Sequence, residues 1–316
     1  MALTVVTLLL IACLAVWMMF SRDLGQARER IEGRGQILAT GPGTMEYATV
    51  AGDSPILVIH GSGGGLDQGL MLAEPLADRG YQLIAPSRFG YLGSPPQEGL
   101  STGRQADAYV DLLDYLGIDQ VVVLGASAGT LSAMQFAIRH ADRCDALVLL
   151  VPASYAPDRA SGESAAEGSA MVWVVQTVLR SDFLFWVALR FAPDAVTRYV
   201  LATEPALVDA AAQAEQERVA EMARTILPIS RRAEGIMFDS ATAGAPDPLP
   251  LAEISCPTLV ISAEDDLYGT AAAARHIAAN VPDAELVIYQ DGGHVLVGRQ
   301  RQTWERVDRF IEQHTR

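Results

Sequence analysis

The stretch VVVLGASAG, residues 121–129, predicts a buried strand that turns sharply into a helix with a serine at the bend. Its first four residues are apolar and mostly β-branched, and residues 130–140 (TLSAMQFAIRH) place apolar side chains at helical spacing. Such a bend strains the backbone at Ser127 and lifts its hydroxyl clear of the sheet, so a bulky residue at Gly125 or Gly129 would collide with it. The pattern G-x-S-x-G indicates a nucleophile elbow. The alternative is a plain strand–turn–helix crossover.

The five histidines of the chain are the candidates for the base that a serine nucleophile requires. His60 ends a predicted strand, His276 lies in a helical stretch and His314 is in the terminal tail. His140 closes the helix after the elbow, where a cation suits the helix dipole and a structural role is expected. His294 follows a predicted strand and a flexible glycine pair, which lets its imidazole swing over the sheet edge. We therefore expect His294 to be the base, with a structural loop histidine as the alternative.

The acid is expected between the serine and the histidine in chain order, as in other folds built on this elbow. The predicted strand 258–262 is followed by AEDDL at 263–267, where three carboxylates stand together. We assign the acid to Asp266, with Asp265 in reserve, although such a run is often only helix-capping charge. The earlier strand, residues 146–151, runs into Pro-Ala-Ser-Tyr and offers no acid at its tip, which favours Asp266.

With Ser127, Asp266 and His294 in this order, the sequence resembles the α/β-hydrolase superfamily from about residue 35 to the C-terminus. Residues 60–65, HGSGGG, resemble the H-G-x oxyanion loop of that family. The resemblance is closer to bacterial esterases and carbon–carbon bond hydrolases. It implies a serine hydrolase of carboxylesterase type that needs neither a cofactor nor a metal.

The resemblance also implies that two backbone N–H groups, those of Ser62 and Ala128, hold the developing oxyanion. Losing one such donor typically costs about 10²–10³ in rate. Two positions depart from the family pattern: Ser87 stands where many members carry an aspartate, and Ala263 replaces the usual glycine before the acid. Neither departure touches the predicted triad, but both weaken assignment to a named subfamily.

The alternation of strands and helices independently predicts an α/β fold with a mostly parallel, eight-stranded sheet flanked by helices. Helical stretches lie between the later strands, for instance 102–116, with Ser101 or Thr102 as a cap. The first two strands, separated by Gly-Pro-Gly, are expected to form an antiparallel hairpin. The predicted strands are 36–39, 45–50, 56–59, 82–85, 121–124, 146–151, 258–262 and 285–289.

The strand–helix rhythm stops for about a hundred residues before residue 258, and alanine-rich helical stretches replace it. We expect these residues, 154–249, to form a helical cap inserted into a core made of 35–153 and 250–316. Predicted helices within the cap are 171–179, 183–191 and 208–226, with prolines as breakers. Five aromatic residues are expected to line an apolar pocket or to pack the cap on the core: Trp173, Phe183, Phe185, Trp186 and Phe191.

The N-terminal segment is an uncharged apolar run, residues 2–20, about as long as the hydrocarbon core of a bilayer. A cleaved signal peptide would need a basic start and a small-x-small site, which are missing, and LIAC at 10–13 only partly matches a lipoprotein box. We therefore expect residues 1–21 to be an uncleaved single-pass transmembrane anchor. Arginines follow the run and none precedes it, which predicts a catalytic domain on the cytoplasmic side: Arg22, Arg28, Arg30 and Arg34.

Net charge, lysine content and cysteine number exclude or disfavour several classes of partner and of site. The net charge of −15 disfavours nucleic acid or anionic lipid as a main partner. The chain contains no lysine, which excludes a Walker-type phosphate loop and a Schiff-base enzyme. Its three cysteines, Cys13, Cys144 and Cys256, are far apart in sequence and are expected to be small apolar fillers rather than a disulfide or metal set.

The sequence thus predicts a membrane-anchored serine hydrolase that forms an acyl-enzyme with a small ester or similar carbonyl substrate carrying an apolar part. A carbon–carbon bond hydrolase or an acyltransferase can use the same triad and is the nearest alternative. A non-catalytic ligand-binding protein on the same fold is the alternative from a different class. The sequence does not indicate the oligomeric state.

Overall fold

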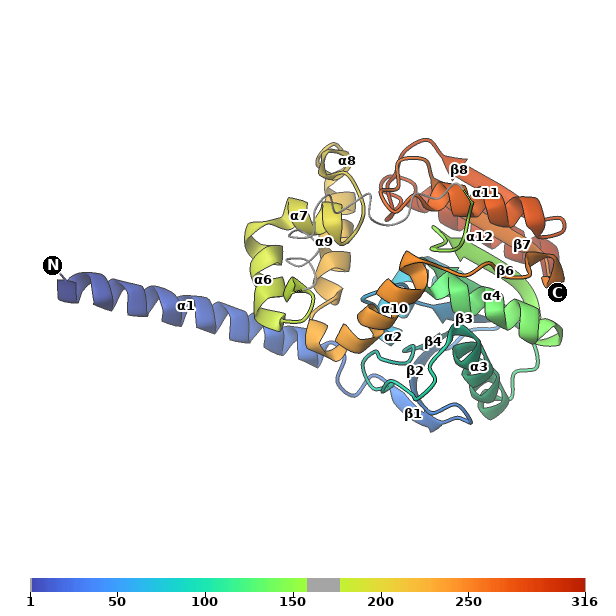
Figure 1. The fold of residues 1–316 in the computed structure, drawn as a ribbon, viewed down its shortest axis with the longest axis horizontal. Helices are drawn as coiled ribbons and strands as arrows, with labels where there is room; N and C mark the ends of the chain where they lie inside the picture. Colours follow the sequence, from blue (N-terminus) through green and yellow to red (C-terminus); the bar gives the residue numbers. More distant parts are fainter. Residues whose placement is uncertain (1, 158–176, 316) are drawn as a thin grey trace.

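A single twisted sheet forms the centre of the computed structural model, which describes residues 2–157 and 177–315 (Figure 1). The strand order is β1-β2-β4-β3-β5-β6-β7-β8. The strands are β1 Gln36–Ala39, β2 Thr44–Val50, β3 Pro55–Ile59, β4 Gln82–Pro86, β5 Val121–Ala126, β6 Cys144–Leu150, β7 Thr258–Ala263 and β8 Glu285–Tyr289. The predicted eight-stranded sheet is confirmed, with strand limits that differ by two residues or fewer.

The sheet is antiparallel at one edge and parallel elsewhere. β1 pairs antiparallel with β2, and β2 pairs antiparallel with β4, so the predicted hairpin is correct. From β4 across β3, β5, β6 and β7 to β8, every pair is parallel. All residues of β5 and β7 are buried, as expected for continuous apolar strands covered on both faces. The carboxyl ends of the parallel strands therefore meet along one edge.

Five helices cover the two faces of the sheet. α2 (Leu66–Ala77) and α12 (Gln300–His314) pack on one face. α3 (Thr102–Leu116), α4 (Gly129–Arg139) and α11 (Thr270–Asn280) pack on the other. The Ser101 side chain accepts a hydrogen bond from the Arg104 N–H and caps α3, as the sequence predicts.

Helices inserted between β6 and β7 lie beyond the carboxyl edge of the sheet (Figure 1). The predicted helix 208–226 is divided, because the backbone at Ala212 is extended and Gln216 donates hydrogen bonds to carbonyls of the preceding turn. Most of the predicted helix 171–179 lies outside the described residues. The inserted helices are α6 Asp182–Phe191, α7 Pro193–Tyr199, α8 Pro205–Asp209, α9 Gln213–Thr225 and α10 Ala233–Gly244, and short 3-10 turns are η1 Ala141–Arg143, η3 Ile229–Arg231 and η4 Leu251–Glu253.

Helix α1 (Ala2–Glu29) projects from the body of the molecule (Figure 1). By length and composition it can cross a membrane, with a mean hydropathy of 2.6 in its most apolar window, and a signal sequence would pass the same test. The helix continues past residue 21, and Phe20 and Leu24 are buried among the inserted helices. The Trp186 indole N–H donates to Asp23 Oδ2 at 2.8 Å, which ties α1 to α6.

The cap aromatics that the structure describes divide between buried and exposed positions. Phe185 and Trp186 are buried and pack α6 against α1, rather than against the sheet. Phe183 and Phe191 are 39% and 68% exposed, and Trp173 lies outside the described residues. A cavity of about 480 Å³ lies between α1 and helices α6, α7 and α9, with Trp186 in its wall, and its described lining includes no residue of the predicted triad.

Two cysteines that are remote in sequence are close in space. The Sγ atoms of Cys144 and Cys256 are 3.3 Å apart and both thiols are free. Cys144 begins β6 and Cys256 lies two residues before the start of β7, and these parallel neighbours start at the same edge of the sheet. Sequence spacing did not indicate this proximity, because it depends on the order of the strands.

Candidate active site

The elbow at Ser127 joins β5 directly to α4. Ser127 has φ of 50°, a left-handed conformation that is uncommon for any residue but glycine. A Cβ at Gly129 would overlap the His60 carbonyl oxygen, and one at Gly125 would lie 2.7 Å from the Cβ of Ala133. Gly129 is therefore needed because the end of β3 approaches the start of α4, and Gly125 because α4 packs closely on β5; neither is needed because of contact with the serine itself.

Ser127, His294 and Asp266 form one hydrogen-bonded chain at the carboxyl edge of the sheet. Ser127 Oγ lies 2.9 Å from His294 Nε2, and His294 Nδ1 lies 2.8 Å from Asp266 Oδ2. Ser127 follows β5, His294 follows β8 and Asp266 follows β7, and the carboxyl ends of these parallel strands lie along one edge of the sheet, with β6 between β5 and β7. Nδ1–H donating to the carboxylate leaves Nε2 free to accept the serine proton. The structure brings together the three residues that the sequence singled out.

Two residues that sequence reasoning missed hold Asp266 in place. The Tyr268 N–H donates to Oδ1 at 2.8 Å, and the Thr270 hydroxyl donates to Oδ2. The Tyr268 ring also packs edge-on against the His294 ring, with centroids 5.0 Å apart. Asp266 itself is 5% exposed, so these partners satisfy a buried carboxylate. No local motif in the sequence distinguishes these two residues.

Asp265, the reserve for the acid, occupies a different position. Its carboxylate accepts hydrogen bonds from the backbone N–H groups of Gly292 and Gly293, at 3.2 and 2.8 Å. These glycines immediately precede His294. Asp265 thus holds the backbone of the histidine loop and makes no hydrogen bond with the imidazole.

The glycine-rich loop after β3 lies against the elbow. A Cβ added at Gly61 would lie only 3.2 Å from the Ser127 Cβ. Among the described residues, the backbone N–H groups of Ser62 and Ala128 donate no hydrogen bond to other protein groups. Two free donors beside a serine have the composition of an oxyanion hole. They are the two groups named from the sequence.

His60 is fixed in a neutral form behind this loop. Its Nδ1–H donates to the Gly61 carbonyl at 2.7 Å, and its Nε2 accepts the Arg88 N–H at 3.0 Å. Burial, followed by the positive charge of Arg88, lowers the pKa of His60 well below its ordinary value. Both ring nitrogens are used by the backbone, so this histidine is structural.

The two departures from the expected family pattern are accommodated locally. Ser87 is buried, accepts a hydrogen bond from the Leu66 N–H at the start of α2, and donates to Glu46, both at 3.1 Å. It therefore satisfies one of the free N–H groups in the first turn of α2, whose N-cap residue is Gly65. Ala263 is a buried residue at the end of β7, where its methyl group joins the core.

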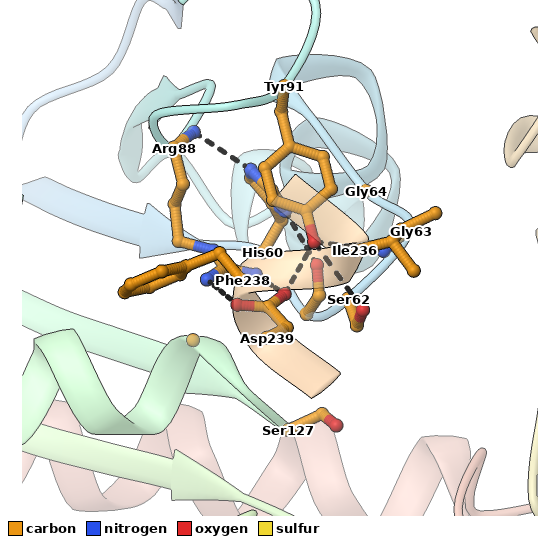
Figure 2. Close-up of polar contacts among 12 residues, drawn as sticks. His60, Ser62, Gly63, Gly64, Arg88, Tyr91, Ser127, Ile236, Phe238 and Asp239 are labelled. Carbon is orange, nitrogen blue, oxygen red and sulfur yellow. Dashed lines mark hydrogen bonds and ion pairs between the residues drawn. The ribbon is translucent and has the colours of Figure 1, made fainter. Parts of the chain in front are cut away.

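Two buried arginines near the glycine-rich loop were also missed by sequence reasoning. Arg88 binds Asp239 of α10, and Arg232 binds Asp67 of α2, with all four side chains at most 5% exposed. Figure 2 shows Arg88 and Asp239 beside the glycine-rich loop, together with Tyr91.

Within the described residues no group of three or more His, Cys, Asp or Glu side chains is arranged to hold a metal ion.

Comparisons with known proteins agree with this architecture. The chain is 26% identical over 264 residues to an uncharacterized hydrolase, YcgS, of Bacillus subtilis, covering 80% of this chain and 89% of the relative. It is 25% identical over 274 residues to a 2-hydroxy-6-oxononadienedioate/2-hydroxy-6-oxononatrienedioate hydrolase of Paraburkholderia xenovorans, covering 82% and 84%.

Solved structures and family models extend the comparison. A bacterial membrane phospholipase A has the same fold, with a TM-score of 0.67, 21% identity, and coverage of 98% of this chain and 97% of that one. The family model for the alpha/beta hydrolase fold matches residues 54–298, which is most of the chain and contains every predicted site residue. The chain therefore belongs to the alpha/beta hydrolase fold family.

Proposed function

We propose that this hydrolase uses Ser127 as a nucleophile and proceeds through an acyl-enzyme. The observation that carries the proposal is the continuous chain from Ser127 Oγ through His294 to Asp266, with contacts of 2.9 and 2.8 Å. A serine in hydrogen-bond contact with a base that is oriented by a buried acid is the arrangement that activates a hydroxyl. The strained elbow at Ser127 adds to this support, because backbone strain persists where function requires it.

The proposed mechanism moves one proton back and forth. His294 Nε2 takes the Ser127 proton as Oγ attacks the substrate carbonyl, and Asp266 stabilises the imidazolium that forms. The imidazolium then returns the proton to the leaving group, and the acyl group stays on Oγ. Water repeats the cycle, with His294 again as the base. The free N–H groups of Ser62 and Ala128 would receive the oxyanion in both halves.

We infer an ester substrate with an apolar part, presented at a membrane. Residues 3–18 of α1 carry many exposed large apolar side chains, which fits a single-pass anchor. The arginines after the run would keep the catalytic domain on the cytoplasmic side. The helices within 154–249 would serve as a cap over the core. Because a similar fold belongs to a protein titled a membrane phospholipase A, lipid esters are the first natural substrates to test.

Carbon–carbon bond hydrolysis is the second candidate, since a curated relative at 25% identity carries the name of such an enzyme. The same serine and histidine can serve that reaction, so the site geometry does not separate the two. Comparing turnover of a ring-cleavage dienoate with that of simple esters at equal enzyme concentration distinguishes them. A preference for the dienoate would replace the ester assignment.

The deciding experiment is labelling with a fluorophosphonate, which modifies activated serines. Wild type should be labelled, whereas Ser127→Ala and His294→Ala should not, and Ser127→Ala should lose on the order of 10⁶ in kcat with folding intact. Ser101→Ala is the matched control, because it removes a serine hydroxyl that only caps α3. It should be labelled like wild type.

Near-normal turnover by Ser127→Ala would contradict the proposal directly. A folded wild-type protein that takes no label and hydrolyses no ester, yet binds a ligand tightly, would instead favour the non-catalytic alternative. Transfer of the acyl group to an added alcohol in preference to water would indicate an acyltransferase.

A further inference from the structure

A buried tyrosine hydroxyl contacts the glycine-rich loop. The Tyr91 hydroxyl lies 3.4 Å from the Ser62 Oγ and 3.4 Å from the Gly63 backbone nitrogen. Figure 2 shows its oxygen as the meeting point of contacts from the loop and from Asp239. Tyr91 itself is fully buried. One hydroxyl therefore contacts the residue whose N–H we assign to the oxyanion hole and the residue after it.

Asp239 fixes the direction of that hydroxyl. Tyr91 donates its proton to Asp239 Oδ2 at 2.5 Å, so its lone pairs are left for the Gly63 N–H and the Ser62 hydroxyl. Arg88 holds the same carboxylate with two parallel contacts, Nη1–Oδ1 at 2.7 Å and Nη2–Oδ2 at 2.5 Å. A bidentate pair fixes the plane of the carboxylate as well as its position. We call Arg88, Tyr91 and Asp239 the oxyanion brace.

The start of α10 holds the loop at a second point. Arg232, directly before the helix, donates to the Gly64 carbonyl and binds Asp67 of α2 at 3.1 and 2.8 Å. Asp239 comes from the same helix. The glycine-rich loop is therefore held from one inserted helix at two successive places.

The segment that carries Tyr91 also packs closely against the start of α10. The Gly235 N–H donates to the Gly90 carbonyl at 2.9 Å, and a Cβ at Gly235 would overlap the Tyr91 ring. The Leu92 N–H donates to the Arg231 carbonyl at 2.7 Å. Movement of α10 would therefore move Tyr91 with it.

We propose that Tyr91, oriented by Asp239 and Arg88, is a positioning residue that sets the place of the Ser62 N–H for the oxyanion. The inference rests on the proposed function, because it assigns a task within the same reaction. Stability alone is a weak explanation for the brace, since a buried ion pair is often no more stabilising than apolar residues of equal volume. Fixing the geometry of a glycine-rich loop is a task that an apolar cluster cannot perform through directed hydrogen bonds.

The test compares Tyr91→Phe with Tyr81→Phe in the full-length protein. Tyr91→Phe keeps the ring and removes the hydroxyl. We expect kcat per labelled active site to fall about tenfold, less than the roughly 10²–10³ for losing an oxyanion donor outright, while KM stays within about twofold. Tyr81, which lies before β4, forms a similar trio with Asp308 and Arg79. Tyr81→Phe removes its hydroxyl and should leave kcat and KM unchanged.

A second readout separates positioning from packing. A trifluoromethyl ketone bound to Ser127 places an oxyanion where the transition state does, so its inhibition constant should rise about tenfold in Tyr91→Phe, in parallel with the loss in kcat. Asp239→Asn should move both quantities in the same direction. If Asp239→Asn does not fold, the Tyr91→Phe result decides alone.

Unchanged kcat and unchanged ketone affinity in Tyr91→Phe, with a normal count of labelled sites, would overturn the inference. An equal loss in Tyr81→Phe would overturn it as well, because the effect would then be general destabilisation. Ser127→Ala, assayed in parallel, tests the proposed function separately: full activity there removes both proposals, whereas an inactive Ser127→Ala beside a normal Tyr91→Phe removes only this one.

Discussion

Strand β4 has an arginine, a tyrosine and an aspartate grouped at each of its ends. Before it, Arg79 and Tyr81 share Asp308 of α12, both at 3.0 Å. We call these three residues the amino-edge trio, and after β4 the oxyanion brace repeats the same residue types. The side chains of Arg79 and Asp308 are 33% and 22% exposed, whereas those of the arginine and aspartate in the brace are 2% and 3% exposed.

The two groups make similar contacts at different edges of the sheet. Both groups join a sheet connection to a helix through one carboxylate. Only the brace lies at the carboxyl edge, where parallel strands direct their following loops to a common site, and only the brace touches the glycine-rich loop. The same three residue types thus form a partly exposed ion pair and hydrogen bond at the amino edge, and part of a proposed active site at the carboxyl edge.

The largest expected contrast between the edges is in catalysis. Asp266→Asn should lower kcat about 10⁴-fold, because an amide in place of the carboxylate no longer holds the His294 tautomer or stabilises its charged form. Asp308→Asn, at the amino edge, should leave kcat unchanged. Steady-state ester hydrolysis per labelled site measures both.

Asp265→Asn should be assayed beside Asp266→Asn. The Asp265 carboxylate holds the backbone of the histidine loop, so we expect a smaller loss of kcat in Asp265→Asn than in Asp266→Asn. A greater loss in Asp265→Asn would exchange the two assignments and make Asp265 the triad acid.

The next contrast is in stability. Asp239→Asn leaves the Arg88 guanidinium buried without its counter-charge, and we expect the free energy of unfolding to fall by about 3–5 kcal/mol. Asp308→Asn removes a partly exposed pair, for which about 0.2–1 kcal/mol is expected. Urea unfolding of the two variants, followed by circular dichroism, gives the comparison.

Equal losses of unfolding free energy in Asp239→Asn and Asp308→Asn would contradict the expectation that the buried pair matters more than the exposed one. Asp239→Ala should cost at least as much as Asp239→Asn, since it also leaves the Tyr91 hydroxyl without an acceptor. That ordering checks that the missing charge partner, and not a strained amide, causes the loss.

The sheet and the proposed triad could be predicted because their signals are local. Continuous apolar runs mark buried strands whatever the rest of the chain does, and the residues after them must gather at one edge. Ser127 and His294 each follow such a run with glycines beside them, so topology alone brings them together. Both were found from their neighbours in the sequence.

The oxyanion brace could not be predicted in this way. Asp239 lies 151 positions from Arg88, on an inserted helix whose path depends on tertiary packing. In sequence it is an ordinary acidic residue in a helix, where solvent exposure is the usual expectation. The same reason hid the contact between the two buried cysteines, which are 112 positions apart.

The last prediction concerns how His60 makes the stability of the protein depend on pH. Its pKa in the folded protein is well below 6.5, owing first to burial and then to the adjacent charge of Arg88, with Arg232 acting in the same direction. In the unfolded chain the imidazole takes up a proton near pH 6.5, so the folded state is favoured above that pH and loses stability as the pH falls through it. Between pH 7 and 5 this one group should remove about 2 kcal/mol from the free energy of unfolding.

His60→Gln tests the assignment, because glutamine keeps one donor and one acceptor but does not titrate. Urea unfolding at pH 7 and pH 5 should give a smaller difference for His60→Gln than for wild type, even though the variant starts from lower stability. Ser127→Ala retains His60 and should show the wild-type difference, which separates the effect from any change at the nucleophile. A difference as large in His60→Gln as in wild type would place the titrating group elsewhere and leave the neutral imidazole behind the glycine-rich loop without a measurable role in acid sensitivity.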